Sequence, residues 1–482
     1  MSNKHENNSM MPPKKIIQGG ALPHKTILSL QGSTNNSDKV VEVRNGGFGS
    51  DLASHPTNPN QFYALTDRGP NADFEGSEGA GKKFLIADYT PRIGLFEIQS
   101  DGTIIKIKEI LLKDTSKNPI SGLPNPKALG GTNEVPYDIN GQLITCDSTR
   151  PFDVVINPIK TDVWGLDPEG LVALMDGSFW VSDEYGPHIV HFNAEGVEIE
   201  RINPFNNDKR NNVIVNGKIL LLPYELCKRN ANKGMESLTI TPDQTTLVAI
   251  IEASLNNPSG SGASCDLTRI VTINLKTGQI SQYLYRLNNA QQFTSGIVAI
   301  NHHEFYVIEH DRKFPLQTGH PQKHIYKIDV SQATDIESIV KANGDSSITD
   351  NPYREFDLVQ DEDLGLLIDG KTLEQIVASK NLGWERLFEL AILPVKKQLA
   401  VDVMSEIDYP HDKLEGIWLR EDGSIGLLND DDFGITDEDE NIEQKYLDIN
   451  KTIEDTNRLY IIELTPAVKS VQLNLGDFNY AA

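Results

Sequence analysis

A two-strand unit recurs five times along the chain, and this internal repeat limits the possible folds more than any other feature. Its clearest copy opens at Glu169, turns at Asp176-Gly177 and closes at Glu184. An Asp-Gly pair between two apolar runs is a strong signal for a tight hairpin. In every copy, 15 to 17 residues separate the opening residue from the polar residue that closes the second strand. The opening and closing residues are Ser50 and Asp67, Glu169 and Glu184, Glu236 and Glu252, Ser295 and His310, and Glu415 and Asp430.

The repeat predicts a β-propeller. Where two copies adjoin, their starts lie about 60 residues apart, which suits one four-stranded antiparallel blade. We expect an all-β propeller with six such blades, five or seven being the alternatives, and a few short helices in insertions. The length of 482 residues alone would allow about three domains. Blades share one closed ring, however, so we expect a single propeller domain over residues 25–470.

Two segments interrupt the repeat. Residues 113–163 form a long, irregular, proline-rich stretch, and loops of this length in compact domains are often functional. We therefore expect residues 113–163 to lie over the ligand site. Residues 331–410 have lost the repeat, and we interpret them as a degenerate sixth blade or a large insertion. Within them, Thr372 opens a capping box, which predicts the start of a short helix.

The sequence also allows predictions for the two ends of the chain. Residues 1–24 are polar and aperiodic, so we expect a disordered N-terminal segment, and we expect a C-terminal tail over residues 471–482. Residues 26–30 and 40–43 are candidate strands, one of which we expect to pair with the last blade and close the ring. The first 25 residues contain no apolar core of the kind found in signal peptides. Either the protein is cytosolic or its leader is missing from this sequence.

The composition excludes several classes of partner and site. The chain has 69 acidic and 44 basic residues, a formal net charge of −25. Nucleic-acid binding is driven by basic surfaces, so we expect no nucleic-acid partner. No stretch approaches the roughly 18 apolar residues of a membrane-spanning helix, so we expect no membrane partner. The three cysteines are scattered without CxxC spacing, which indicates neither a zinc site nor a disulfide framework.

Acidic residues recur at both ends of the repeated unit, and this pattern points to a cation site. The innermost strands of a propeller line its central channel, so equivalent positions of the blades form rings around one mouth. Clustered carboxylates repel one another unless something compensates. Calcium, which takes six to eight oxygen ligands, suits such a ring; magnesium demands stricter octahedral geometry, and zinc prefers histidine and cysteine. The candidate ligands are Asp67, Glu169, Asp183, Glu184, Glu236, Glu252, Glu309, Glu415 and Asp430.

Structural roles are the alternative for the same residues. A glutamate that opens an inner strand can accept hydrogen bonds from backbone amides of the neighbouring blade, and the glycine after it can serve close packing alone. Two arginines near the mouth are open to two interpretations as well. Arg68 follows Asp67 and Arg312 follows Asp311. Because arginine binds phosphate or carboxylate bidentately, these side chains either hold an anionic ligand or neutralise the adjacent acids.

Several motifs together resemble the phytase-like β-propeller family, whose description is "esterase-like activity of phytase". The similarity spans roughly residues 45–465. The motifs are residues 65–73 (LTDRGPNAD), 166–170 (LDPEG), 179–187 (FWVSDEYGP), 414–417 (LEGI) and 429–434 (NDDDFG). The resemblance implies a β-propeller and, by the family description, a phosphoester hydrolase; similarity to the calcium-dependent alkaline phytases is at the level of the fold. Many relatives are exported, which leaves the localisation open.

These observations lead to three functional hypotheses. The first is a calcium-dependent hydrolase of a small phosphoester or other anionic substrate, which we expect to be a monomer. In it, Glu184 or Glu236 acts as general base, Arg68 steadies the phosphate, and His310 is a further catalytic candidate. The second is a cation-binding propeller that docks a ligand or a protein without turnover, and the third is a metal-dependent lactonase-type hydrolase. The chain lacks a Gly-x-Ser-x-Gly motif, which disfavours a serine esterase.

Overall fold

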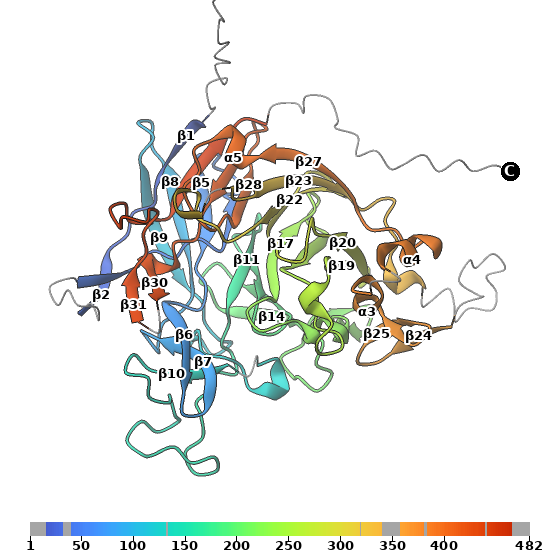
Figure 1. Cartoon of the computed structure of the whole chain (residues 1–482), viewed down its shortest axis with the longest axis horizontal. Coiled ribbons are helices and arrows are strands. Elements are labelled where there is room, and N and C mark those ends of the chain that lie inside the picture. Colours follow the sequence, from blue (N-terminus) through green and yellow to red (C-terminus); the bar gives the residue numbers. More distant parts are fainter. Residues whose placement is uncertain are drawn as a thin grey trace, which may run out of the picture.

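The structure is a computed structural model that describes residues 16–31, 40–131, 134–318, 320–339, 357–379, 383–438 and 441–464. The main body of these residues is a ring of five four-stranded antiparallel sheets, blades 1 to 5 (Figure 1). From the inner to the outer strand, blade 1 is β4 (Asp51–Ser54), β5 (Gln61–Leu65), β8 (Arg92–Ile98) and β9 (Ile104–Leu111); blade 2 is β11 (Pro168–Ala173), β12 (Phe179–Asp183), β13 (His188–Phe192) and β14 (Glu198–Ile202); blade 3 is β17 (Met235–Ile240), β18 (Thr246–Ile251), β19 (Leu267–Asn274) and β20 (Ile280–Arg286); blade 4 is β21 (Phe293–Ala299), β22 (Glu304–His310), β23 (Lys323–Asp329) and β27 (Lys396–Asp402); blade 5 is β28 (Gly416–Leu419), β29 (Ile425–Leu428), β32 (Arg458–Ile462) and β1 (Ile16–Ala21).

The inner strands close the ring. β4 lies beside β11, β11 beside β17, β17 beside β21, β21 beside β28, and β28 beside β4 again. A hydrophobic core fills each gap between adjacent blades; between blades 2 and 3, for example, Trp180 and Ile189 pack with Leu247 and Ala249. Successive side chains of a strand point to opposite faces, so each blade supplies apolar residues to two of these cores. The predicted β-propeller is therefore confirmed.

The described chain contains five blades, which corrects the expected six to one of the alternatives. Residues 331–410 do not form a blade, because their strand β27 pairs with β23 as the outer strand of blade 4. The part before β27 is an insertion on the outer strands of blade 3 (Figure 1), where Ile376 and Trp384 share a core with Leu267. The expected capping box at Thr372 is present. The elements of this segment are β24 (Leu358–Asp361), β25 (Gly365–Ile368), β26 (Lys371–Thr372), α3 (Leu373–Val377), α4 (Gly383–Glu389) and, after β27, α5 (Val403–Glu406).

The N-terminal strand β1 completes blade 5 by antiparallel pairing with β32, with Gln18 opposite Ile461. The expectation of disorder through residue 24 is therefore wrong from residue 16 on, whereas residues 1–15 and the expected tail 471–482 lie outside the described residues. The strands expected to close the ring, β2 (Thr26–Gln31) and β3 (Val40–Arg44), pair with each other instead. β3 packs on the loop that follows β29.

Two hairpins stand over one mouth of the ring, each inserted between the second and third strands of a blade. In blade 1 the hairpin is β6 (Asn71–Gly76) and β7 (Gly79–Phe84), extended by β10 (Val135–Tyr137); in blade 5 it is β30 (Ile435–Glu438) and β31 (Asn441–Gln444). β30 contacts β6, so the two hairpins meet.

Of residues 113–163, which we expected over the site, Ile120 belongs to the core between blades 1 and 2, and Glu134 lies 3.4 Å from Arg68.

The remaining features of the described chain are its helices, its cysteines and several short elements. No helix in the described residues is long and apolar enough to span a bilayer. Cys146, Cys227 and Cys265 are free thiols. The remaining elements are β15 (Ile214–Val215), β16 (Lys218–Ile219), α1 (Pro315–Thr318) and the 3₁₀ turns η1 (Lys127–Leu129), η2 (Tyr224–Lys228), η3 (Gly262–Ser264) and η4 (Asp432–Gly434).

The second residue of each repeated unit lies against the inner strand of the next blade. A Cβ added to Gly170 would lie 2.4 Å from the backbone nitrogen of Leu238 in the next blade, so only glycine fits there. Two blades carry a polar residue at this position instead, Asp51 and Ser237, and both are fully buried. Oδ2 of Asp51 accepts hydrogen bonds from the Leu171 amide (2.9 Å) and the Ser237 hydroxyl (3.3 Å). The carboxyl group of Asp51 thus joins blades 1, 2 and 3 across the channel.

Replacement of Asp51 by alanine is expected to destabilise the ring by about 2–4 kcal/mol. The substitution leaves the Leu171 amide and the Ser237 hydroxyl buried without an acceptor, and each such group costs roughly 1–3 kcal/mol. Asp51→Asn keeps one acceptor oxygen and should cost less. Urea unfolding of wild type, both variants and a Glu195→Ala control on an exposed turn measures the difference. A loss in Asp51→Ala no greater than in the control would contradict the prediction.

Candidate functional site

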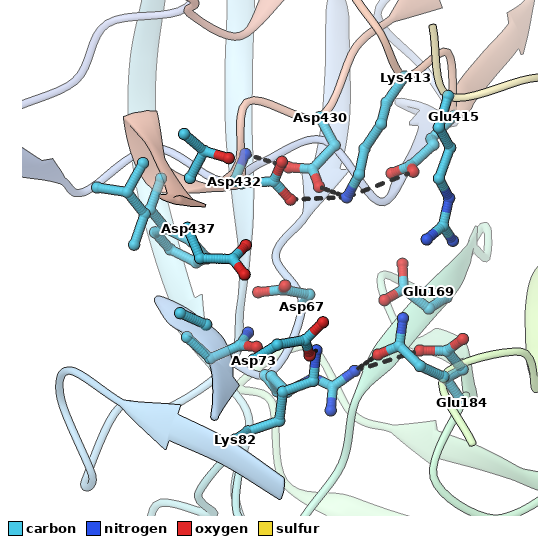
Figure 2. A pocket seen from close by; sticks show the side chains of 18 of the residues that line it. Asp67, Asp73, Lys82, Glu169, Glu184, Lys413, Glu415, Asp430, Asp432 and Asp437 are labelled. Atoms are coloured by element: carbon cyan, nitrogen blue, oxygen red, sulfur yellow. Dashed lines mark hydrogen bonds and ion pairs between the residues drawn. The ribbon is translucent and has the colours of Figure 1, made fainter. Parts of the chain in front are cut away.

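A polar cavity of about 200 Å³ opens at the mouth beneath the two hairpins (Figure 2). Acidic side chains outnumber basic ones on its walls, so the cavity carries a strong negative charge when its carboxyl groups are ionised. The acidic residues are Asp67, Asp73, Glu169, Glu184, Glu236, Glu415, Asp430, Asp432 and Asp437, and the basic residues are Arg68, Lys82, Arg312 and Lys413. Seven of the eleven predicted site residues are among them: Asp67, Arg68, Glu169, Glu184, Glu236, Glu415 and Asp430.

The backbone aims the opening glutamates into this cavity. Strand pairing skips one residue where β11 meets β12 and where β17 meets β18, and the skipped residues are Glu169 and Glu236. Such a β-bulge redirects the side chain of the extra residue, which is why bulges are common next to active sites. Glu415 stands directly before β28. The closing residues that line the cavity follow their second strands by one or two positions and are Asp67, Glu184 and Asp430.

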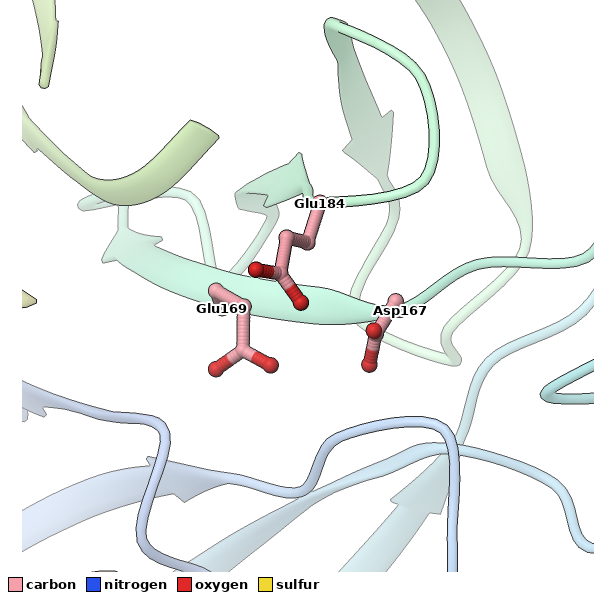
Figure 3. A group of neighbouring side chains, drawn as sticks. All are labelled: Asp167, Glu169 and Glu184. Carbon is pink, nitrogen blue, oxygen red and sulfur yellow. The ribbon is translucent and has the colours of Figure 1, made fainter. Parts of the chain in front are cut away.

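Two groups of three carboxylates share Glu184. Asp167, Glu169 and Glu184 each offer an oxygen within 4.8 Å of the other two (Figure 3), and Glu184, Glu236 and Glu252 do the same. All five side chains are buried. Oε2 of Glu236 and Oε2 of Glu252 have no hydrogen-bond partner among the described residues. Buried polar atoms are rarely left without any partner in folded proteins, so these two oxygens are available to a cation or to water.

Burial and mutual repulsion raise the pKa values of these carboxyl groups. Burial is the larger cause for Glu169, Glu184 and Glu236, whose pKa values lie well above the usual range, and adjacent carboxylates add to the rise. Burial also raises the pKa of Glu415 to about 8 and that of Asp430 to about 6, although Lys413 opposes both shifts. Without a cation these shifts favour the protonated forms, so that Glu415 retains its proton near neutral pH, whereas a nearby positive charge would favour the ionised forms.

Arg68 is buried among the acids of the cavity. Its guanidinium lies 2.6 Å from Asp167, 3.4 Å from Glu134 and 3.5 Å from Glu184, and it donates to the side chain of Asn232. Only 4% of the Arg68 side chain is exposed. To steady a phosphate, as the sequence predicts, Arg68 would have to exchange one of these contacts for the ligand.

An ion-pair network forms another wall of the cavity. Nζ of Lys413 lies 2.7 Å from Asp430 and 2.6 Å from Asp432 (Figure 2), and Lys445 holds Asp432 from the other side at 2.6 Å. Although burial opposes it, the two lysines hold the pKa of Asp432 well below its usual range. Asp432 and Phe433 have φ values of 49° and 60°, a left-handed conformation that is costly for residues other than glycine. The network therefore fixes a strained turn at the site.

The sequence analysis did not propose six charged residues of the site: Asp73, Lys82 and Asp437 on the two hairpins, and Asp167, Lys413 and Asp432 beside the repeated units. The last three have a simple relation to the repeat. Asp167 and Lys413 precede an opening glutamate by two positions, and Asp432 follows Asp430 by two positions. The other copies carry different residue types at these positions, namely Phe48, Gly234 and Phe293 before the opening residue and Gly69, Gly186, Ser254 and Arg312 after the closing one, so the repeat gives no signal for them. These three residues matter because Asp167 completes a carboxylate group, while Lys413 and Asp432 supply a wall of the cavity.

The structure places four predicted residues, Asp183, Glu252, Glu309 and His310, outside the cavity walls, although Glu252 still belongs to one of the two carboxylate groups. Asp183 accepts hydrogen bonds from backbone amides, Glu309 accepts them from a tyrosine hydroxyl and a backbone amide, and Nδ1 of His310 lies 2.8 Å from the carbonyl oxygen of the next residue. Asp183 and Glu309 stand one position before the closing residue. Because successive strand side chains point to opposite faces, these two acids face away from the mouth.

The residues of this site belong to a region that matches a known family. A family model described as "Phytase-like: Esterase-like activity of phytase" matches residues 43–433, most of the chain. The chain belongs to this phytase-like family. The resemblance predicted from the sequence motifs is thereby confirmed, and the family description points to a hydrolase-type function.

Individual relatives of this phytase-like chain are more distant. A protein of Arthroderma benhamiae described as an uncharacterized secreted protein is 38% identical over 107 residues, which is 20% of this chain and 21% of that protein. The match thus spans about a fifth of the curated relative's length. Three similar solved structures have low TM-scores. A putative glucose dehydrogenase of Thermus thermophilus is 10% identical, with 86% of this chain and 82% of that chain covered and a TM-score of 0.30. A gluconolactonase of Xanthomonas campestris is 9% identical (83% of this chain and 89% of that chain covered, TM-score 0.25), and a calcium structure of a Trichoderma reesei carbohydrate-active enzyme of family AA12 is 8% identical (86% of this chain and 98% of that chain covered, TM-score 0.27).

The raised pKa values predict how the stability of the phytase-like ring depends on pH in the presence of chelator. A carboxyl group with a higher pKa in the folded than in the unfolded state stabilises the fold at low pH, and this contribution is lost as the pH rises through the folded value. Asp430 (about 6) and Glu415 (about 8) set the window. We expect the free energy of unfolding to fall by more than about 2 kcal/mol between about pH 5 and pH 8.5, since a tenfold difference in proton affinity is worth about 1.4 kcal/mol.

Urea unfolding in chelator at several pH values measures this dependence. Glu415→Gln removes one raised pKa and should give a shallower slope than wild type. A free energy of unfolding that stays level or rises over this interval would show that the acids of the mouth do not carry the predicted protons.

Proposed function

We propose that this protein is a calcium-dependent phosphoester hydrolase whose acidic cavity holds a divalent cation and a small anionic ester. The observation that carries the proposal is the pair of buried carboxylate groups that share Glu184, three of whose five members, Glu169, Glu184 and Glu236, line one cavity. The family description supports hydrolysis, and the oxygen-only donor set supports a hard cation. We propose that the protein acts as a monomer, without a nucleic-acid or membrane partner.

The donor set fits calcium better than other common divalent cations. Asp167, Glu169, Glu184, Glu236 and Glu252 supply carboxylate oxygens, and neither group contains histidine or cysteine, which zinc sites use. Calcium accepts six to eight oxygens in flexible geometry, whereas magnesium requires a near-ideal octahedron. The unpaired oxygens of Glu236 and Glu252 are available as ligand atoms.

The residues around the cavity divide the work of hydrolysis in this proposal. The five buried carboxylates would hold the cation, which when bound supplies Lewis acidity at a phosphoryl oxygen and lowers the pKa of a coordinated water. Glu184 or Glu236 would accept a proton from the attacking water, because both carboxylates line the cavity. His310 has no part in this scheme, since it lies outside the cavity walls and belongs to neither carboxylate group.

Hydrolysis of p-nitrophenyl phosphate by the full chain, with and without chelator, tests the proposal, together with a metal analysis of the purified protein. We expect turnover that chelator abolishes and calcium restores. Calcium binding without turnover of any ester would instead support a cation-binding propeller that docks a ligand or protein. Hydrolysis of lactones but not of phosphoesters would support a lactonase-type hydrolase, and either outcome would overturn the phosphoester assignment.

A further inference from the structure

We propose that Arg312 contacts the anionic group of the substrate, at a subsite for phosphate-class anions beside the buried carboxylates. This inference rests on the phosphoester hydrolysis proposed above and names the residue that recognises the ester. Arg312 lines the cavity between blades 3 and 4, two residues after the end of β22. It differs from the other basic residues of the cavity in how many of its hydrogen-bond donors are already used.

The other three basic side chains of the cavity are engaged by acids. Arg68 contacts three carboxylates and is buried. Nζ of Lys413 lies within ion-pair distance of Asp430 and Asp432, at 2.7 and 2.6 Å. Nζ of Lys82 lies 2.6 Å from an oxygen of Asp73. Each of these cations would have to give up an existing ion pair to bind a ligand, and that exchange reduces the net gain.

Most of the hydrogen-bond donors of Arg312 are unused among the described residues. One guanidinium nitrogen, Nη2, lies 2.7 Å from Oε1 of Glu252, and among the described residues no hydrogen bond is recorded for the other two nitrogens. The side chain is 41% exposed, against 4% for Arg68. A guanidinium carries five N–H donors in a planar fork that matches phosphate bidentately. Most of this fork is therefore available to an anion in the cavity.

An aromatic ring orients the Arg312 side chain. Cζ of Arg312 lies 4.8 Å from the ring centroid of Phe293, and Nζ of Lys233 lies 4.3 Å from the same centroid. Cation–π contacts of this kind restrict a long side chain, so less conformational entropy is lost when a ligand binds. Lys233 also adds a second positive charge. Arg312 and Lys233 thus bring two positive charges to an otherwise acidic mouth.

The position of Arg312 also suits an ester whose other oxygens face a cation. Glu252, and to a lesser extent Glu236 and Glu415, raise the pKa of Arg312 above its usual range. The guanidinium therefore lies beside the carboxylates that would hold the cation, and an anion bound to Arg312 would lie next to them. A phosphoester has enough charged oxygens to meet both partners, whereas a neutral ester or lactone would leave the fork unused.

Phosphate binding to the full chain in calcium buffer, measured by calorimetry with inorganic phosphate as the probe, tests the inference. Arg312→Gln should weaken phosphate binding at least about tenfold, the effect of one lost charge-assisted contact, and should raise KM for p-nitrophenyl phosphate more than it lowers kcat. Arg312→Lys keeps the charge without the fork and should recover part of the affinity. Lys313→Gln is the matched control, because Lys313 is 57% exposed and pairs only loosely with Asp311, at 3.9 Å.

A double variant separates contact with the ligand from simple neutralisation of Glu252. If Arg312 only compensates Glu252, the Arg312→Gln/Glu252→Gln protein will bind phosphate as well as Glu252→Gln alone. If Arg312 contacts the anion, the double variant will remain at least about tenfold weaker than Glu252→Gln. Calcium titration of Arg312→Gln, followed by the melting temperature, gives a readout that does not depend on activity, and the calcium response should persist.

The outcomes distinguish this inference from the proposed function. An unchanged phosphate affinity in Arg312→Gln, full recovery in the double variant, or a wild-type protein that binds no phosphate would overturn the role of Arg312. Chelator-sensitive hydrolysis in the same wild-type protein would leave the proposed function intact. Conversely, phosphate binding that depends on Arg312, without any phosphoester turnover, would support the anion subsite and overturn the hydrolase.

Discussion

Chelation of divalent cations is expected to lower the melting temperature of the protein, and added calcium is expected to restore it more fully than magnesium. Five buried carboxyl groups gather at the mouth, and two of their oxygens have no partner among the described residues. A cation that binds the folded state and not the unfolded chain stabilises by mass action, by about 2.7 kcal/mol at 100 times its dissociation constant. Thermal unfolding across calcium and magnesium titrations, after chelation, measures the effect.

Two variants make this experiment specific to the cavity. Glu236→Gln removes one charge and keeps the shape of the side chain, so it should weaken the response of the melting temperature to calcium. Glu195→Gln alters an exposed acid on a turn and should respond as wild type does. A wild-type melting temperature that neither chelator nor calcium moves would refute the metal site and favour the alternative, a ring of structural carboxylates.

Glu184→Gln is expected to reduce kcat/KM for p-nitrophenyl phosphate by at least about a hundredfold, the low end for loss of a general base. Glu184 is the residue that both carboxylate groups share, so the substitution removes one negatively charged ligand from each group. It also removes a candidate general base from the cavity. Glutamine keeps the side-chain carbonyl that accepts from the Gly234 amide, at 3.3 Å in wild type, so the fold should be retained.

Steady-state kinetics with circular dichroism as a check on folding tests the Glu184 prediction. Glu184→Asp restores the negative charge on a side chain that is one methylene shorter. It should therefore recover more of the calcium affinity than of kcat. Glu309→Gln is a matched buried glutamate outside the cavity walls, and its effect on activity per folded molecule should be small. Near-wild-type turnover by a folded Glu184→Gln protein would remove Glu184 from the mechanism.

The repeat was sufficient to predict the propeller and most of the acidic mouth. Glu169, Glu236 and Glu415 occupy one equivalent position in three blades, so the symmetry of the ring brings them together without knowledge of any loop. Their exact orientation depends on β-bulges at Glu169 and Glu236, and these follow a strand-pairing register that the sequence does not state. Asp183 and Glu309 were misplaced because a shift of one residue along a strand reverses the side-chain direction.

The blade count failed for a different reason. Residues 331–395 were inserted between the third and fourth strands of blade 4, and β27 returns to the sheet only at Lys396. A pairing across so long an insertion leaves no local signal. Likewise, Asp167 and Lys413 fall outside the repeated strands, and their places in the site depend on contacts between loops of different blades.

Closure of blade 5 by β1 has a consequence for how the molecule folds. β1 and β32 stand at opposite ends of the described chain, with Gln18 paired to Ile461, so this contact is among the least local in the protein. Closing such long loops is entropically costly and slow, so we expect the ring to close late, after the internal blades have formed. Until then the edge of β32 and the apolar face of blade 5 remain open to pairing with other chains. Aggregation during refolding should therefore begin at blade 5, and it should worsen when residues 16–21 are removed.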